Sequence, residues 1–206
     1  MKPNFGRRRS IRLKDYDYSQ SGLYFITICT ANNRCLFCNA PADTLNHSHV
    51  GNIARDCWLE IPIHFKNVKL DEFVVMPNHI HGIIGLTDEE QRRAENFQPL
   101  QLHKQNVGVQ YIEPSLSRNR FQHLTPKSIG SIIRSYKAAV TRQCRKDEIC
   151  EIVWQRNFYE RIIRSEKELN CLREYIANNS LNWNIDRENP MSENYELEYT
   201  EYFGTK

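Results

Sequence analysis

The sequence of 206 residues has no long apolar run. No stretch approaches the roughly 18 consecutive apolar residues of a membrane-spanning helix, and Met1 is followed by basic residues without the apolar core of a secretion signal. The sequence also has no internal repeat and no low-complexity tract. These absences argue against membrane, secreted and repeat proteins, so the expected location is the cytoplasm.

The seven cysteines do not form the framework of a small disulfide-rich scaffold. Their number is odd, and they are scattered through segments expected to be strands and helices, which favours reduced thiols. Hydrophobic residues make up 40% of the chain and charged residues 26%, close to ordinary globular values. The length favours one folded domain with additions.

Charge is unevenly distributed, although the net charge is only +3. Residues 1–20 carry six Lys or Arg against two Asp, whereas residues 186–206 carry two basic and six acidic residues. A basic arm fits a phosphate backbone, because each contact releases counterions, but a solvated tail has the same composition. We expect a basic arm (1–20), a central domain (21–185) and an acidic tail (186–206) lying over the surface.

Aromatic and β-branched residues predict four strands. In the first, Tyr24, Ile26 and Ile28 would lie on one face of a sheet, and Phe25 and Thr27 on the other. The predicted strands cover residues 23–29, 68–76, 79–86 and 152–163.

Helical spacing of apolar residues predicts three helices. Pro62 should end or kink the first helix, and Thr125 with Pro126 should cap and open the second. Ser165 and Glu168 have capping-box spacing at the start of the third. The predicted helices cover residues 50–65, 125–144 and 166–178.

The resulting order β-α-β-β-α-β-α predicts an α+β protein of the ferredoxin-like split βαβ class. Its antiparallel sheet would carry helices on one face, with an extra C-terminal helix. The polar residues 87–124 interrupt this pattern and are expected to be an inserted loop.

The motif MPNHIHG places His79 and His81 two residues apart in a predicted strand. Strand side chains alternate, so both imidazoles should project from the same face of the sheet. Two adjacent imidazoles are half of a metal site, since imidazole is a common ligand of transition metals. Two histidines with ordinary hydrogen-bond partners remain the alternative.

Tyr175 and Asn179 lie four residues apart in LREYIANNSLNW, and are therefore neighbours on one face of the third predicted helix. Leu169, Leu172 and Ile176 form the adjacent apolar stripe that would pack on the sheet. This arrangement could bring Tyr175 and Asn179 toward the histidine strand. A tyrosine at such a position also commonly serves packing alone.

Three motifs then resemble a known family. RRRSIRLKDYDYSQSGLYFITICT, VVMPNHIHGII and WQRNFYERIIRSEKELNCLREYIANNSLNW resemble, in this order, the REP-associated tyrosine transposases of the single-tyrosine HUH superfamily of insertion-sequence-like transposases. The resemblance covers most of residues 7–185 and implies the ferredoxin-like fold.

The resemblance also implies the site residues. His79 and His81 match the metal-binding histidine pair, Tyr175 matches the nucleophile, and Asn179 matches a third metal-binding polar residue that is often Gln in more distant relatives. The implied cofactor is a divalent metal, Mg²⁺ or Mn²⁺. Ser180 stands where family members commonly have Pro, a departure that touches no implied catalytic residue.

The activity implied is cleavage and rejoining of single-stranded DNA with hairpins (REP-like repeats) through a covalent 5′-phosphotyrosine. Related enzymes include dimers, so a homodimer is one expectation. Arginine and lysine donors and tyrosine rings are our candidates for DNA contacts. These residues are Arg7, Arg8, Arg9, Arg12, Lys14, Tyr16, Tyr18, Arg134 and Lys137.

Four other interpretations remain open. A catalytically silent regulatory protein could bind hairpin DNA with this fold, and a phosphodiesterase could use water with Tyr175 merely structural. Tyr136 and Tyr159 are rival nucleophiles. A structural zinc site could also form from Cys35, Cys38, His47 and His49, although the spacing of the two histidines is tight for that purpose.

Overall fold

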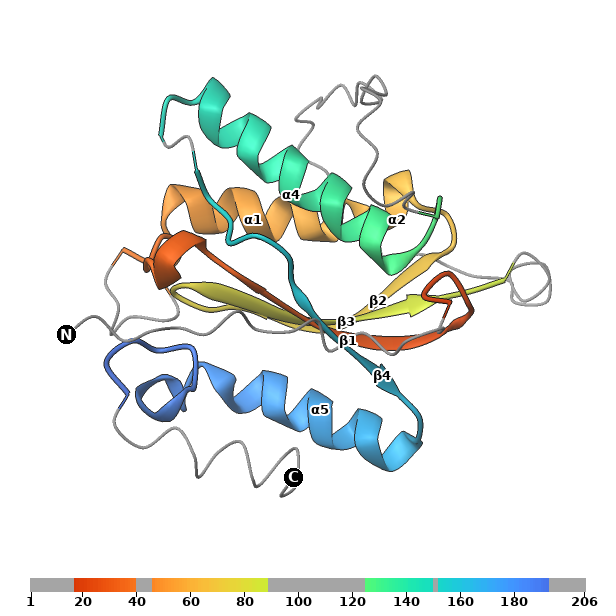
Figure 1. Ribbon diagram of the computed structural model, residues 1–206. Helices are drawn as coiled ribbons and strands as arrows, with labels where there is room; N and C mark the ends of the chain where they lie inside the picture. The colour runs from red at the N-terminus through yellow and green to blue at the C-terminus, as the bar shows by residue number, and fades with distance from the viewer. Residues whose placement is uncertain (1–16, 40–45, 89–124, 150–151, 193–206) are drawn as a thin grey trace.

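A computed structural model describes residues 17–39, 46–88, 125–149 and 152–192. Its centre is one four-stranded sheet with the order β2-β3-β1-β4, in which all neighbouring strands are antiparallel (Figure 1). The strands are β1 (Gly22–Cys29), β2 (Val68–Val75), β3 (His79–Leu86) and β4 (Tyr159–Ile163).

Helices cover both faces of this sheet. α1 (His49–Leu59) and α4 (Ile129–Lys146) lie on one face, and α5 (Glu166–Asn179) lies on the other (Figure 1). The predicted α+β class, with the ferredoxin-like sheet and an extra C-terminal helix, is confirmed. Within the described part of the chain, none of the helices has both the length and the apolar character needed to cross a membrane.

The side chains of β1 point alternately into two hydrophobic cores, one on each face of the sheet. Tyr24, Ile26 and Ile28 are fully buried in the larger core beneath α1 and α4, whereas Phe25 packs in the smaller core with α5. The predicted division of these side chains between the two faces is thereby confirmed. Thr27 lies on the face of Phe25, which is also the face of the candidate site.

Two large aromatic side chains fill the core between α1, α4 and the sheet. Trp58 of α1 and Tyr136 of α4 meet edge to face, with ring centroids 5.3 Å apart. Gly82 lies beneath Trp58, where a Cβ atom would come within 2.4 Å of the indole Cζ2. The Tyr136 hydroxyl donates a hydrogen bond of 3.0 Å to the carbonyl of Ala54, so Tyr136 is a core residue.

Local sequence signals set most helix ends. Ser48 caps α1 by accepting from the amide of Gly51, and the helix ends before Glu60. The break predicted near Pro62 is present, because a separate turn, α2 (Ile61–His64), carries this proline in its first turn.

The start predicted for the second helix is wrong. Lys127 has a positive φ of 64°, which separates Thr125 and Pro126 from the helix. Ser128 is the actual N-cap of α4, because its hydroxyl accepts from the amide of Ser131.

The strand predicted over residues 152–163 is shorter than expected. Its first part makes only an isolated bridge, between Trp154 and Thr30, and Asn157 has a positive φ of 68° that interrupts the extended chain. Regular pairing with β1 begins at Tyr159. Composition indicated a strand throughout, but a left-handed residue cannot continue a ladder.

The third helix is predicted correctly. Ser165 caps α5 by accepting from the amide of Glu168. Arg173 of α5 holds Asp71 of β2 through two hydrogen bonds, of which Nε to Oδ1 measures 2.8 Å. This paired contact fixes the rotation of α5 over the sheet beside Tyr175.

Candidate functional site

The histidine pair lies on the α5 face of β3. His79 pairs with Cys29 of β1 and His81 pairs with Thr27, so both imidazoles project toward α5. Their ring centroids are 4.4 Å apart, and both side chains are buried. The predicted placement of the two rings on one face is thus present in the structure.

Asn78 determines which ring nitrogen of His79 carries the proton. The Asn78 amide donates to the carbonyls of Glu188 at 2.6 Å and Asn33 at 3.3 Å, so its Oδ1 is left to accept from His79 Nδ1 at 2.8 Å. The proton on Nδ1 leaves the lone pair on Nε2. A metal-binding histidine commonly has this arrangement, with an oxygen accepting from its other ring nitrogen.

Tyr175 reaches His81 from α5. The Tyr175 hydroxyl and His81 Nε2 share a hydrogen bond of 3.1 Å, while His81 Nδ1 and the Thr27 hydroxyl share one of 2.8 Å. The Tyr175 ring packs edge-on against Phe25 at 6.1 Å, and only 7% of the residue is exposed. Helix α5 therefore places the predicted nucleophile directly beside the histidine pair.

Asn179 follows one helical turn after Tyr175 and is completely buried. Its amide makes no hydrogen bond within 3.5 Å among the described residues. It nevertheless lies close enough to Asp186 to contribute to lowering the pKa of that carboxyl. The predicted third ligand is thus in the site, next to an acid that the sequence did not single out.

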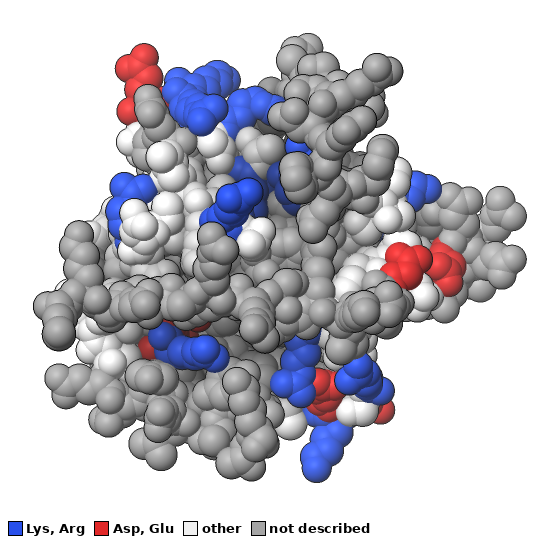
Figure 2. All heavy atoms as spheres, in the orientation of Figure 1, with Lys and Arg blue, Asp and Glu red and all other residues white. Residues whose placement is uncertain are grey.

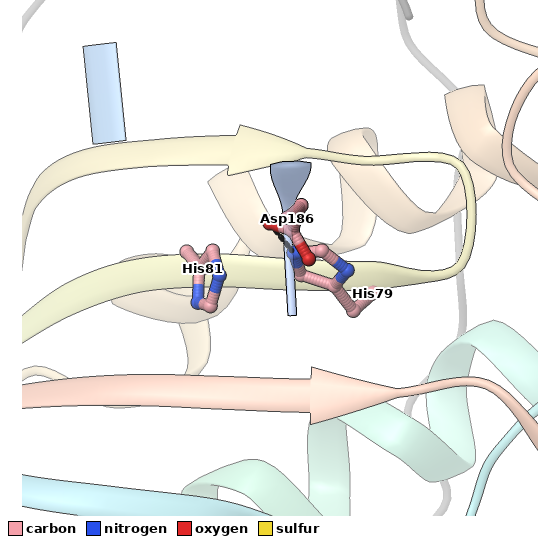
Figure 3. Close-up of side chains that lie close together, drawn as sticks. All are labelled: His79, His81 and Asp186. Atoms are coloured by element: carbon pink, nitrogen blue, oxygen red, sulfur yellow. Dashed lines mark ion pairs between the residues drawn. The ribbon is translucent and has the colours of Figure 1, made fainter. Parts of the chain in front are cut away.

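Asp186 is the main departure from the prediction. We expected the segment after α5 to run over the surface, but the short 3₁₀ helix η2 (Trp183–Ile185) turns the chain inward and buries Asp186 to 1% exposure. Figure 3 shows its carboxyl beside the ring of His79, with 3.7 Å between Oδ2 and His79 Nε2. An acidic residue in an acidic tail carries no local signal of such burial.

The protonation states of these side chains favour the binding of a cation. Burial lowers the pKa of His79 to about 3 and that of His81 well below its usual value, so both rings are neutral ligands at pH 7. The lone pair of His79 Nε2 therefore faces a carboxylate oxygen of Asp186, and neither atom has a hydrogen-bond partner. Burial in turn raises the pKa of Asp186, and this effect outweighs the opposite effects of His81, of Asn179 and of the amides of Glu188 and Asn189.

These three side chains could hold one metal ion. Their ligand atoms all lie within 4.8 Å of one another, and ligands about 2.1 Å from one ion lie roughly 3 to 4 Å apart, so the group would have to contract slightly around an ion. His79, His81 and Asp186 form the single group of this kind within the described ranges.

The alternative zinc site does not assemble from its two histidines. His47 Nε2 lies 3.2 Å from the carbonyl of Val75, and His49 Nε2 contacts Asp147 at 3.1 Å. These imidazoles are therefore engaged elsewhere.

The chain after α5 covers the site. Trp183 is buried, with its ring 6.2 Å from that of His79, and Asn189 donates to its carbonyl. The Glu188 carbonyl accepts from Asn78, which ties the cover to the residue that orients His79. No more than 7% of any of the five side chains gathered here is exposed (His79, His81, Tyr175, Asn179 and Asp186).

Most of the predicted DNA contacts lie outside the described residues, namely Arg7, Arg8, Arg9, Arg12, Lys14 and Tyr16. Tyr18 is half-buried, with its ring 6.2 Å from that of Tyr24, and Arg134 is exposed on α4. Lys137 donates to the carbonyls of Gln155 and Asn157, and burial lowers its pKa to about 8. DNA contact by these three residues stays a prediction.

The rival Tyr159 lies on the same sheet face as the histidine pair. It is directly opposite Thr27, which is in turn opposite His81. Its ring is thus one strand further from His81 than Thr27 is. Tyr175, whose hydroxyl already contacts His81, is better placed.

A scan of protein-family models finds no match. The solved structure of a REP-associated tyrosine transposase bound to a REP hairpin aligns with 83% of this chain and 73% of its own, with 17% identity and a TM-score of 0.52. The class of protein is therefore an α+β chain with the fold of that transposase. An uncharacterized protein of Haemophilus influenzae is 43% identical over 180 residues, covering 87% of this chain and 92% of the relative. The chain belongs to the same family as that protein.

Proposed function

We propose that the protein is a transposase-type endonuclease and strand transferase that cleaves and rejoins single-stranded DNA through Tyr175. The observation that carries this proposal is the 3.1 Å contact between the Tyr175 hydroxyl and His81 Nε2, beside a buried group suited to a metal. A buried packing tyrosine also needs a partner for its hydroxyl, as Tyr136 does, so the proposal depends on which partner Tyr175 has: a histidine of the candidate metal group.

His79, His81 and Asp186 would hold the ion, and Asn179 is the further polar residue next to them. When bound, a divalent ion would polarise the scissile phosphate and neutralise its developing charge. Two imidazoles with one carboxylate suit Mn²⁺ better than Mg²⁺, since Mg²⁺ prefers oxygen ligands. The carboxylate adds a negative charge that two imidazoles and one amide would not provide.

The role of Tyr175 is that of a nucleophile. Its Oη would form a bond to the phosphorus while the bond from phosphorus to the 3′ oxygen breaks, and the phenolic proton is balanced by protonation of the leaving 3′ oxygen. A 5′-phosphotyrosine and a free 3′-hydroxyl result, and the reverse reaction rejoins a strand. Because His81 offers Nε2 both to the ion and to the tyrosine, the hydroxyl must leave this nitrogen when an ion binds.

The substrate we propose is single-stranded DNA that folds into hairpins. The solved neighbour with this fold is bound to a REP hairpin, and residues 1–20 of this chain carry six basic side chains that suit phosphates. Arg7, Arg8, Arg9, Arg12 and Lys14 are the proposed backbone contacts, with Tyr16 and Tyr18 against unpaired bases. A homodimer is part of the same proposal.

The test uses a labelled single-stranded DNA library with a fixed imperfect hairpin and randomised flanks, incubated with Mn²⁺. We expect the wild type to give a protein-linked DNA band on a denaturing gel and Tyr175→Phe to give none. Tyr159→Phe is the matched control, because it removes a hydroxyl from the same sheet face and should keep the band. A band retained by Tyr175→Phe would refute the assignment of the nucleophile.

A silent hairpin-binding protein is the second candidate, and the closed site favours it. No more than 7% of any site residue is exposed, so a phosphate has no open access to Tyr175 in this arrangement. Tight hairpin binding without any adduct in Mn²⁺, from the wild type as from Tyr175→Phe, would support this function. Free DNA fragments without a protein-linked band would instead indicate hydrolysis by water.

A further inference from the structure

Helix α4 carries charge of one sign. Residues 129–146 contain five Lys or Arg and no Asp or Glu. Figure 2 shows blue side chains gathered over this helix, on the face of the molecule away from α5. A single helix with this charge attracts a polyanion, and the effect is strongest where its side chains border a concave surface.

Such a surface lies beside α4. A groove of about 430 Å³ runs between the helix and the segment that leads into β4. Three of its six lining residues are cationic and one is an indole: Lys137, Ala138, Thr141, Arg142, Arg145 and Trp154. None of the described residues that line it is acidic.

The indole wall is held rigidly. Trp154 Nε1 donates a hydrogen bond of 3.0 Å to the carbonyl of Lys137, and its ring packs against Phe37 at 5.4 Å and Tyr136 at 5.6 Å. Its orientation is therefore set before any ligand arrives. A preformed wall lowers the ordering cost of binding.

Lys137 is positioned in the same way. Its ammonium donates to the carbonyls of Gln155 at 2.6 Å and Asn157 at 2.8 Å, and lies 5.9 Å from the centre of the Trp154 ring. An ammonium has three donors, so one remains for an anion. Lys137 thus fixes the groove wall and contributes positive charge to it.

The groove and the candidate site lie at the same end of the sheet, on opposite faces. Trp154 bridges to Thr30, whose amide donates to the carbonyl of Asn78, and the preceding residue of β1, Cys29, pairs with His79. A DNA strand that leaves the candidate site would reach the groove by passing around the edge of the sheet at β4. Arg156, exposed in the connecting segment, lies along that route.

Resting on the strand transfer proposed for Tyr175, we infer that the α4 groove binds backbone phosphates of the DNA that flanks the phosphate under attack. Arg142 and Arg145 supply the phosphate contacts, and Lys137 with Trp154 supplies the fixed wall. The ligand is a sugar-phosphate chain, because three of the lining side chains are cationic and such charges bind backbone phosphates whatever the base sequence.

The experiment measures binding of a fluorescent single-stranded hairpin DNA between 50 and 200 mM KCl. The double variant Arg142→Gln/Arg145→Gln should bind about tenfold more weakly, and the slope of log K against log salt should fall by about 1.4, which corresponds to two contacts. Arg164→Gln/Lys167→Gln is the matched control, because it removes two exposed charges at the opposite end of β4. It should change neither quantity.

The possible outcomes distinguish failure of the groove proposal from failure of the strand-transfer proposal. Unchanged affinity and slope in the groove variant, with a Tyr175 adduct in the wild type, would overturn the groove while strand transfer stands. Equal weakening in both double variants would also overturn it, because binding would then follow total charge. Tighter binding of an RNA of the same sequence would overturn the assignment to DNA. Loss of binding confined to the groove variant, with no adduct from any protein, would uphold the groove and reject strand transfer.

Discussion

His79 should make the metal-free protein sensitive to acid. Burial lowers the pKa of this imidazole from 6.5 to about 3, so the unfolded chain binds a proton below pH 6.5 that the folded chain does not bind. The contribution of neutral His79 to the free energy of unfolding is therefore fully present above pH 6.5 and is lost as the pH falls from 6.5 toward 3.

The magnitude follows from the size of the shift. Each pH unit below 6.5 costs about 1.4 kcal/mol, so His79 alone removes about 2 kcal/mol between pH 6.5 and pH 5. His81, whose pKa is lowered as well, adds to this loss. Asp186 acts in the opposite direction, because its raised pKa lets the folded chain take up a proton above 3.8.

Urea unfolding in EDTA at several pH values between 7.5 and 5 isolates the His79 contribution. His79→Gln is the comparison, since its amide does not titrate and can still donate to Asn78. The free energy of unfolding of the wild type should fall by about 2 kcal/mol more than that of His79→Gln over this range. Parallel curves for the two proteins would refute the link between the burial of His79 and stability.

Three further changes test other parts of the structure. Gly82→Ala should destabilise the fold by about 1–3 kcal/mol in thermal unfolding, because the new methyl group meets Trp58; an unchanged melting temperature would contradict this packing. Tyr136→Phe should cost about 1 kcal/mol, since the carbonyl of Ala54 loses a buried donor, and urea unfolding would show it. Asp186→Asn should weaken Mn²⁺ binding by about 10- to 100-fold in calorimetry, because the site loses its charged ligand; equal affinity would exclude Asp186 from the metal site.

Local periodicity was sufficient for part of the site. Alternation in a strand places His79 and His81 on one face whatever the fold, and helical spacing makes Tyr175 and Asn179 neighbours. The meeting of α5 with β3 was expected from the apolar stripe of the helix and from the family resemblance. The 3.1 Å contact itself depends on the packing of α5, including the Arg173 ion pair, and no spacing rule contains it.

Local periodicity could not predict that Asp186 belongs to the candidate site. Its burial depends on Trp183 packing against the sheet and on the carbonyl of Glu188 reaching Asn78, which lies 110 residues earlier in the chain. Composition assigned the whole segment to solvent, because its neighbours are acidic. The length predicted for β4 was wrong for a similar reason, since a single left-handed residue, Asn157, outweighed a strand-like composition.

Because the candidate site and the main core lie on opposite faces of the sheet, their side chains can change independently during evolution. Odd-numbered residues of β1 and β3 contribute to the candidate site under α5, while even-numbered residues such as Ile26 and Ile80 build the main core under α1 and α4. Drift in the main core can therefore change stability while leaving the side chains of the site in contact. Members of this family should then tolerate different aromatic and aliphatic packing beneath α1 and α4 and still keep the same candidate-site side chains on the opposite face.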